Sequence, residues 1–475
     1  MQAMHVSPFG GTWYPGGCEE LERLLEDLFA RSVERTGPFL RDGALGFVVP
    51  HAGVEYSGCV AAAAYRHLQR HPAQRAVVLG FAHRGGPAGV AIPDVDGYAT
   101  PLGEVRTDRE AMARLAARQP FREVPEQRIC DHSVEIQLPL LQWAAPQMQV
   151  VPLFVGHLDG PARDAAAEAL AGLCGPGTVF LVSSDLTHFG RAFGYQPFAV
   201  DSAVSARLEE LDRGVMEAAA SLDAEMFLAA IRESSATVCG VAPISLWLRT
   251  LETAGGEEVF QQTLDYQTSG EITGDYDHTV SYGALGYFRA PSFCLDAQAR
   301  ALLLESAQAT LAHLRATNDP KAVPQSATPE SLAQRLGVFV GLHQGKRLLG
   351  CVGNPTGRES LAVSVPEMTL RAALEDPRFP TVLGVEGPIE IEISVLSPAK
   401  PVRNASRFRI GEHGACLDLG SRRGLLLPQV AAGREWTREQ FLGALSMKAG
   451  MGSQGYKNPR ARLSVFRAQV FATGE

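Results

Sequence analysis

Residues 45–53 read LGFVVPHAG, a short apolar run that leads into a proline and a histidine. Runs that are short, apolar and rich in valine or leucine are typical of strands covered on both faces of a sheet. Three more follow, at residues 75–79, 149–155 and 178–182. Amphipathic or alanine-rich segments alternate with them, and we expect helices at residues 19–33, 59–69, 108–118, 133–144 and 162–173. This alternation predicts an α/β fold with a largely parallel sheet flanked by helices.

The second part of the chain differs in charge and in pattern. At about 150 residues per domain, a chain of 475 residues suggests two or three domains. From Ala290 on there are 22 lysines and arginines against 16 acidic residues, whereas residues 1–289 hold 21 against 36. A long helix is expected at residues 296–316, prolines follow at 320, 324 and 329, and residues 389–393 alternate like a half-exposed strand. We therefore predict two domains, an α/β domain at residues 1–290 and an α+β domain at residues 291–475.

Composition narrows the classes of function. The net charge of -9 argues against a protein that binds nucleic acid through bulk electrostatics. The sequence has neither a recognisable signal peptide nor a run of about 18 apolar residues, so we expect a cytoplasmic protein that does not enter a membrane. The eight cysteines are scattered and form no Cys-x-x-Cys pair, which excludes a simple zinc ribbon or a thioredoxin-type motif.

Three histidines, His51, His83 and His188, each come a few residues after the end of an expected strand. Ligands bind beyond the carboxyl ends of the strands in open α/β sheets, so the imidazoles converge if these strands are neighbours. A fourth donor could come from Asp185 or Cys239. Two histidines with a carboxylate would suit non-haem iron, whereas two histidines with a thiolate would favour a softer metal such as copper.

Simpler interpretations stay open. A single histidine is more often structural or exposed than a metal ligand, and His157 also follows a strand end. Most other histidines, His5 among them, have no comparable context. Cys239 taken alone fits an inert buried thiol. Within residues 131–139 we expect Ser133 to cap a helix, and His132 is either a packed residue at the helix entry or an acid–base group at the same crevice.

Five motifs of the first part resemble the Memo family in order and spacing. They are GTWYP at residues 11–15, PHAGVEYSG at 50–58, DHSVEIQLP at 131–139, SSDLTH at 183–188 and CGVAP at 239–243. The resemblance covers about residues 5–289. It implies a fold related to that of the class III extradiol (LigB-type) dioxygenases, which hold Fe(II).

Carried over position by position, the metal pocket of the family falls on four residues with an acid beside them: His51, His83, His188 and Cys239, with Asp185. His132 matches the histidine of the family's acid-His-Ser segment. For a metal-dependent enzyme we expect His132, His188 and Asp185 to be the catalytic residues: His132 would move protons, and Asp185 would orient an imidazole or bind the metal directly. Two positions depart from the family pattern. Glu55 replaces a tyrosine, and Gln137 stands where a histidine is common.

The second part is similar to the AMMECR family across about residues 296–475. Matching segments are GCVG at 350–353, DPRF at 376–379, IEISVLSP at 391–398 and LLPQVA at 426–431. The family usually has Leu-Arg before Gly-Cys, whereas this chain has Leu348-Leu349, with Arg347 one place early. Residues 448–467 are basic but lack a nucleic-acid-binding motif, so we expect a solvated face there.

Proteins of both kinds are grouped with a radical SAM protein in the AmmeMemoRadiSam system, so the chain looks like a fusion of its B and A components. The radical SAM partner is expected on a separate chain, because this one has no tight three-cysteine cluster for a 4Fe–4S centre. The resemblance implies a metal-binding protein, with Fe(II) or copper, that serves as a redox or oxygen-using component and acts on an unknown small molecule or peptide.

Two alternative functions remain. The first is an extradiol-type non-haem iron dioxygenase, against which the thiol of Cys239 counts, because a carboxylate would complete its metal triad. The second is a non-catalytic scaffold that binds a peptide or a small molecule.

Overall fold

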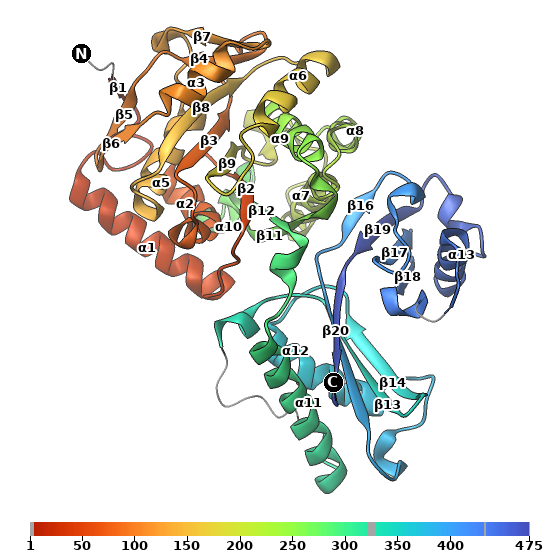
Figure 1. Ribbon diagram of the computed structural model, residues 1–475. Coiled ribbons are helices and arrows are strands. Elements are labelled where there is room, and N and C mark those ends of the chain that lie inside the picture. The colour runs from red at the N-terminus through yellow and green to blue at the C-terminus, as the bar shows by residue number, and fades with distance from the viewer. Residues whose placement is uncertain (1–3, 322–328, 432–433, 475) are drawn as a thin grey trace. The chain divides into compact units, whose positions relative to one another are not determined.

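The computed structural model describes residues 4–321, 329–431 and 434–474 (Figure 1). The chain divides after Arg289 into two compact units, each of which is described by itself. Pro324, part of the connector expected from the sequence, lies outside the described residues. Within the described ranges, none of the helices combines the length and the low polarity that crossing a bilayer requires.

The first unit is built on a nine-stranded sheet whose centre is parallel. Its four central strands are the four expected from the sequence, and each begins and ends within one residue of the predicted bounds. In spatial order they are β2 (Ala44–Val49), β9 (Thr178–Ser183), β3 (Arg75–Gly80) and β8 (Gln149–Val155). The predicted α/β fold is confirmed. The strands that deliver His51, His188 and His83 are therefore direct neighbours, with their carboxyl ends at the same edge.

The outer strands make the sheet mixed rather than purely parallel. Beyond β2 lie three antiparallel strands: β12 (His278–Arg289), β11 (Val259–Thr268) and β10 (His188–Gly190). Beyond β8 lie β4 (Val90–Pro93), antiparallel to β8, and β7 (Phe121–Val124). A separate three-stranded sheet contains β1 (Met4–Val6), β5 (Gly97–Thr100) and β6 (Gly103–Arg106).

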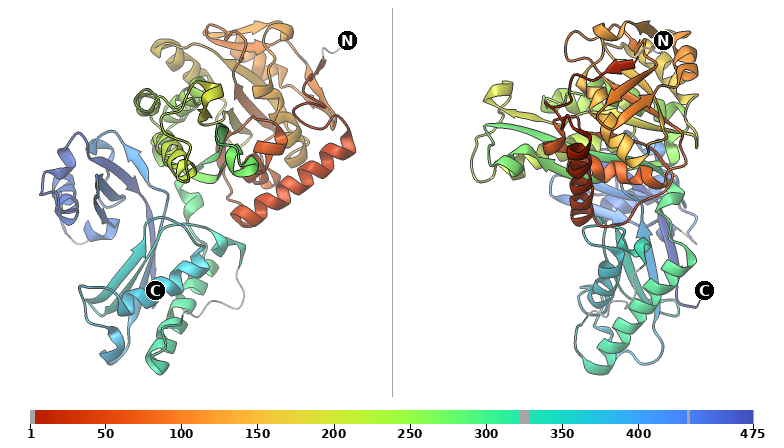
Figure 2. Two further views of the ribbon diagram at one scale, coloured as in Figure 1. Left: turned by 180° about the vertical axis from the view of Figure 1, so that it is seen from behind. Right: turned by 90° about the vertical axis from the view of Figure 1, so that its left-hand side faces the viewer.

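Helices cover both faces of the sheet. Phe47 and Gly46 point to opposite faces because successive residues of a strand alternate. The Phe47 ring contacts His67 of η1 (Arg66–Arg70), whereas a Cβ on Gly46 would meet Trp247 of α9 (Val241–Thr253) at 2.9 Å. Only a glycine leaves room for that close approach. Figure 2 shows the helices from two further directions.

The remaining helices of this unit agree broadly with the sequence pattern. The predicted helix at 59–69 starts earlier, as α2 (Val54–Tyr65), and ends as η1. The predicted helix at 133–144 is two helices, α4 (His132–Glu135) and α5 (Gln137–Ala144). The others are α1 (Cys18–Thr36), α3 (Arg109–Ala116), η2 (Glu126–Arg128), α6 (Gly160–Ala171), η3 (Arg191–Phe193), α7 (Val204–Ala220), α8 (Ala224–Ser234), η4 (Gly256–Glu258) and α10 (Ser269–Thr273).

The second unit contains two four-stranded antiparallel sheets, which confirms the predicted α+β class. The first sheet has the order β14 (Arg347–Asn354), β13 (Val338–Gln344), β15 (Glu390–Leu396) and β20 (Ala468–Ala472). The second has the order β16 (Lys400–Val402), β19 (Arg462–Phe466), β17 (Gly414–Leu419) and β18 (Arg422–Leu426). The helices are η5 (Ala290–Phe293), α11 (Ala297–Thr317), η6 (Glu330–Ala333), α12 (Leu361–Leu374), η7 (Val382–Gly384), η8 (Ala405–Arg407), η9 (Pro428–Ala431), α13 (Arg438–Lys448) and η10 (Gly455–Lys457).

Candidate metal centre

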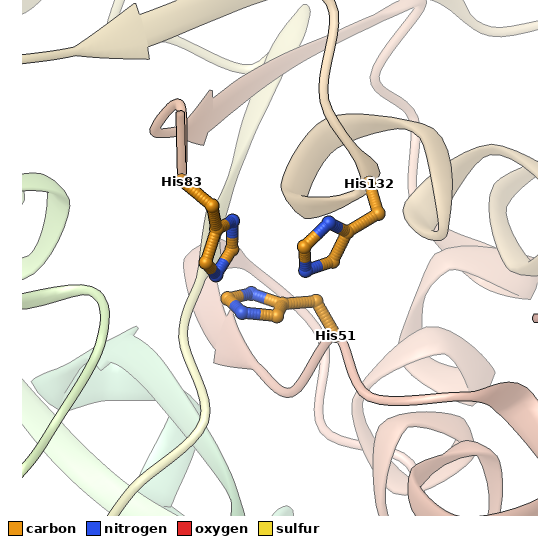
Figure 3. Close-up of side chains that lie close together, drawn as sticks. All are labelled: His51, His83 and His132. Carbon is orange, nitrogen blue, oxygen red and sulfur yellow. The ribbon is translucent and has the colours of Figure 1, made fainter. Parts of the chain in front are cut away.

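Three imidazoles meet beyond the carboxyl ends of the central strands (Figure 3). His51 follows β2, His83 follows β3, and His132 begins α4. Each offers a nitrogen, and the three nitrogens lie within 4.8 Å of one another. The rings of His83 and His132 are stacked with their centroids 4.0 Å apart, and the His51 ring stands edge-on to them at 5.4 and 5.5 Å. His132 thus lies at the entry of a helix with its ring packed, and it also lies beside His51 and His83, so both interpretations of this residue stay open.

A second group of donors shares His51 and adds a carboxylate and a thiol. His51 Nε2 lies 3.3 Å from Cys239 Sγ and 3.9 Å from Asp185 Oδ2. Asp185 follows β9, and Cys239 lies just before the start of α9. The donor atoms of these three residues lie within 4.8 Å of one another. His51 is therefore a member of both donor groups.

His188 approaches the same carboxylate from another side. Its Nε2 lies 4.0 Å from Asp185 Oδ2. That nitrogen is buried and has no hydrogen-bond partner, which is unusual because buried polar atoms are nearly always paired. His188 belongs to none of the three donor groups found among the described residues. Its ring nevertheless places a second imidazole nitrogen near Asp185.

A buried chain of hydrogen bonds fixes the His51 ring. The Nδ1 atom of His51 lies 2.8 Å from Ser183 Oγ. The side-chain amide of Gln137 donates to Ser183 Oγ at 3.1 Å and to the carbonyl of Pro50 at 2.9 Å, and Tyr65 Oη donates to Gln137 Oε1. Ser183 can accept a hydrogen bond from Nδ1 as well, which leaves the Nε2 lone pair free to face Cys239 and Asp185.

Asp131 organises the other two imidazoles. Its carboxylate accepts hydrogen bonds from the backbone N–H of His83 at 3.0 Å and of Ser133 at 2.9 Å, and it lies 2.9 Å from His83 Nδ1 and 3.4 Å from His132 Nδ1. Asp131 is thus the N-cap of α4, and the prediction that Ser133 caps this helix is wrong. The Ser133 hydroxyl instead donates to the carbonyl of Phe81. The carboxylate is the better acceptor here because it serves two imidazoles as well as the helix.

Burial sets the protonation states of the group. It lowers the pKa of His51 to about 3 and that of His132 to about 4, so both rings are neutral at pH 7. Burial also raises the pKa of the Asp185 carboxyl and holds the pKa of the Cys239 thiol far above its usual range. For Asp131, burial opposes ionisation, but hydrogen bonds from His83 and Ser133 outweigh it and hold the pKa at about 2. Neutral imidazole is the form that binds metals.

Comparison with known proteins identifies both parts of the chain. A sequence model described as "Memo-like protein" matches residues 7–286. The chain belongs to the Memo-like family. A model described as "AMMECR1" matches residues 304–471, so the second part is an AMMECR1 domain.

The relatives of the Memo-like domain are spread over distant organisms. A MEMO1 family protein of Thermoplasma acidophilum is 28% identical over 277 residues, which are 58% of this chain and 95% of the relative. A MEMO1 family protein of Methanosarcina barkeri is 33% identical over 287 residues, which are 59% of this chain and 99% of the relative. A crystal structure of an uncharacterized protein from Pyrococcus horikoshii aligns with a TM-score of 0.35 and 28% identity, over 36% of this chain and 90% of that one.

Several residues of the Memo-like domain that support the histidines were not singled out from the sequence. Trp13 stacks on His132 with the ring centroids 4.3 Å apart, and its only signal is its place in the GTWYP motif. Ser183 is the last residue of β9, and its signal in the sequence is its place in the SSDLTH motif. His157 is exposed and lies outside the donor groups, and Glu55 is exposed at the start of α2.

The AMMECR1 domain carries a polar group around Cys351. The Asp376 carboxylate accepts a hydrogen bond from the Cys351 backbone N–H at 2.8 Å, and the Arg378 guanidinium donates to the Cys351 carbonyl at 2.9 Å. Arg378 also bonds Asp376 at 2.7 Å. The Gly-Cys segment therefore has the guanidinium of Arg378 beside it, which the DPRF segment supplies.

Proposed function

We propose that the Memo-like domain binds a redox-active metal ion, Fe(II) or copper, and serves as a redox or oxygen-using component of a radical-SAM-associated modification system. The proposed ligands are His51, His83, His188 and Cys239, with Asp185 beside them. One observation carries the proposal. The Nε2 atoms of His51 and His188 lie 3.9 and 4.0 Å from one oxygen of a buried carboxylate, and the second of these nitrogens has no hydrogen-bond partner.

The donor set fits such an ion chemically. Imidazole suits iron and copper alike, and a thiolate shifts the preference towards the softer metal. A bound ion of either kind would supply one-electron redox chemistry and a site for oxygen. The Nε2 lone pairs of neutral imidazoles are available at pH 7, whereas the Cys239 thiol must first lose its proton.

The other side chains have tasks that do not involve a bond to the ion. Asp185 Oδ1 accepts the backbone N–H groups of His51 at 2.8 Å and of Ala52 at 3.3 Å, which fixes the loop that carries the first histidine. His132 is the group that would move protons, because its neutral ring lies beside Asp131 and faces His51. Asp131 holds both His83 and His132 in position.

Elemental analysis tests this proposal. The full chain is purified anaerobically, and iron and copper are measured per chain for the wild type and for His51→Ala and His83→Ala. The matched control is His157→Ala, which removes an exposed strand-end histidine outside the donor groups. We expect a loss of metal in the first two variants and none in the control. Unchanged metal content in His51→Ala and His83→Ala overturns the site.

An extradiol-type dioxygenase is the second candidate, and one observation favours it. Asp185 shares a donor group with His51, so histidine and carboxylate donors are both present for a facial triad. The thiol of Cys239 in the same group counts against it. Oxygen uptake by iron-loaded protein over a panel of catechols decides between the two, and no uptake with any catechol removes the dioxygenase.

The proposed partner is a radical SAM protein on a separate chain, and the substrate is a small molecule or a peptide. Co-purification of the full chain with that protein from a host in which both are expressed tests the partnership.

A chain that contains no metal after anaerobic purification, yet binds a peptide or a small molecule, would instead support the scaffold function. The eight free thiols agree with a reducing, cytoplasmic location.

A further inference from the structure

A further group of nitrogen, sulfur and oxygen donors lies around α4, apart from the two groups that share His51. It consists of His5 of β1, Cys130 and Glu135, whose donor atoms lie within 4.8 Å of one another. None of these residues belongs to the proposed metal centre. Cys130 and Glu135 nevertheless lie on the same short segment as His132, which separates them in the chain.

The carboxylate of Glu135 is the reason to look for a cation here. Its side chain is 0% exposed. One oxygen, Oε1, lies 3.2 Å from His5 Nε2, whereas the other, Oε2, is buried and has no hydrogen-bond partner. A buried carboxylate oxygen without a donor is strongly unfavourable, because burial removes water and nothing replaces it. A metal ion bound beside this oxygen would remove that deficit.

The surroundings of His5 match those of a metal-binding histidine. A ligating imidazole usually donates its other ring N–H to a carboxylate, which fixes the tautomer and the direction of the lone pair. His5 Nδ1 lies 3.5 Å from Glu126 Oε2, so that N–H has a carboxylate to face while Nε2 points towards Glu135. The Tyr98 ring packs edge-on against His5 with the centroids 5.4 Å apart and supports its orientation.

We propose that His5 Nε2, Cys130 Sγ and Glu135 bind a second metal ion of the zinc type, separate from the ion proposed at His51. Zinc prefers imidazole, thiolate and carboxylate donors, and tetrahedral Zn²⁺ holds such atoms about 3.3–3.6 Å apart. His5 Nε2 and Glu135 Oε1 are 3.2 Å apart, and the donor atoms of all three residues lie within 4.8 Å of one another, so small side-chain shifts would bring them to these distances. Three protein ligands leave a fourth position for water.

Binding requires the loss of the thiol proton, and of any proton on His5 Nε2, but no electron transfer. The Cys130 thiol is protonated at pH 7, since burial raises its pKa to about 12. On binding, its S–H bond breaks, the proton passes to solvent, and the sulfur lone pair forms the bond to Zn²⁺. Burial lowers the pKa of His5, but the nearby Glu135 and Glu126 outweigh that effect and raise it above its usual value. The metal and the proton therefore compete for His5.

A spectroscopic titration with Co²⁺, which replaces Zn²⁺ in such sites, tests the proposal. The full chain is stripped of metal with a chelator and carries Cys239→Ser, so that the first centre has no thiol. We expect a near-ultraviolet thiolate-to-Co²⁺ charge-transfer band that saturates at one equivalent. Adding Cys130→Ser abolishes the band, and adding Cys174→Ser, which removes a partly buried thiol elsewhere, leaves it unchanged. Absence of the band in the Cys239→Ser protein, or its survival after Cys130→Ser, overturns the proposal.

A second variant keeps the test informative if Cys130→Ser does not fold. Glu135→Gln preserves the size of the side chain and leaves the reporting thiol in place. We expect the Co²⁺ affinity read from the same band to fall at least tenfold. An unchanged affinity means that Glu135 is only the partner of a histidine ion pair and not a ligand, and it overturns the assignment. All samples share the Cys239→Ser background and keep His51, His83 and His188, so the result does not depend on the iron and copper content that tests the first centre.

Discussion

The protonated thiol of Cys239 makes proton release the sharpest test of the proposed centre. Its sulfur accepts a hydrogen bond from the Asp185 backbone N–H at 3.1 Å and has Asp185 beside it, and burial keeps its pKa far above neutral. The neutral ring of His51, with a pKa of about 3, has no proton to lose between pH 6 and pH 8. Of these two ligands, only the thiol therefore has a proton to release when a metal ion binds.

The magnitude follows from that stoichiometry. One proton released per ion makes the apparent affinity rise tenfold per pH unit, which is about 1.4 kcal/mol. From pH 6 to pH 8 the affinity should rise about 100-fold, or about 2.7 kcal/mol. In Cys239→Ser the dependence should disappear, since a serine hydroxyl keeps its proton over this range. The affinity itself should also fall, because the serine offers only a weak neutral oxygen.

Isothermal titration calorimetry with Fe²⁺ under anaerobic conditions measures this directly. Two buffers with different enthalpies of ionisation give the number of protons released, and the Cys130→Ser background removes the contribution of the second proposed site. The Cys174→Ser variant serves as the control and should release as many protons as the background. Binding that releases no proton, or a pH dependence that persists in Cys239→Ser, would show that the thiol is not a ligand.

Three further predictions concern the stability of the two domains and the support of the histidines. Gly46→Ala should lower the free energy of unfolding of the first unit, measured by urea denaturation, by about 1–3 kcal/mol, because its Cβ would lie 2.7 Å from a carbonyl oxygen of β9 in the centre of the sheet. The control Gly214→Ala in α7 has open space around its Cβ and should not destabilise the unit. Gln137→Leu should lower the free energy of unfolding by about 2–3 kcal/mol, because Ser183 and the Pro50 carbonyl lose their buried hydrogen-bond donor. It should also weaken metal binding at His51, and an unchanged metal affinity in the folded variant would contradict this. Hydrogen bonds from Arg378 hold the pKa of Asp376 at about 2, below its usual 3.8. The ionised carboxylate therefore contributes about 1–2 kcal/mol to the free energy of unfolding of the AMMECR1 domain above about pH 5, and this contribution is lost as the pH falls towards 2. In Asp376→Asn, the free energy of unfolding should depend less steeply on pH over this acid range.

The parts of the fold that follow from the sequence are those with a strong local pattern. The four central strands are continuous apolar runs, and their burial on both faces leaves no other arrangement for segments so rich in valine and leucine. The meeting of His51 and His83 follows from the same pattern, because parallel strands bring their carboxyl ends to one edge. The order of the strands, with β9 between β2 and β3, comes from packing and has no local signal.

The features that the sequence did not predict, or predicted wrongly, also have specific physical causes. Ser133 and Asp131 are both good helix caps, and only the positions of His83 and His132 decide in favour of the carboxylate. Short strands such as β6 carry little apolar pattern, since three of its four residues are exposed. His5 had no context in the sequence because its partners lie about 130 residues away, and the pairing of β1 with β5 brings them together.

The segment from Cys130 to Glu135 connects the two proposed metal sites. Its single helical turn has Asp131 at the N-cap, where the carboxylate orients His83 and His132, and Glu135 at the last position, where the carboxylate faces His5. A turn of four residues has little stability of its own, so its geometry depends on what its ends contact. A cation beside Glu135 would tie the turn to β1 and thereby hold Asp131 in the position that stacks His83 on His132. The second site would thus act as a positioning element for the first, and the loss of its metal should loosen the histidine pair without removing a single ligand from the proposed centre.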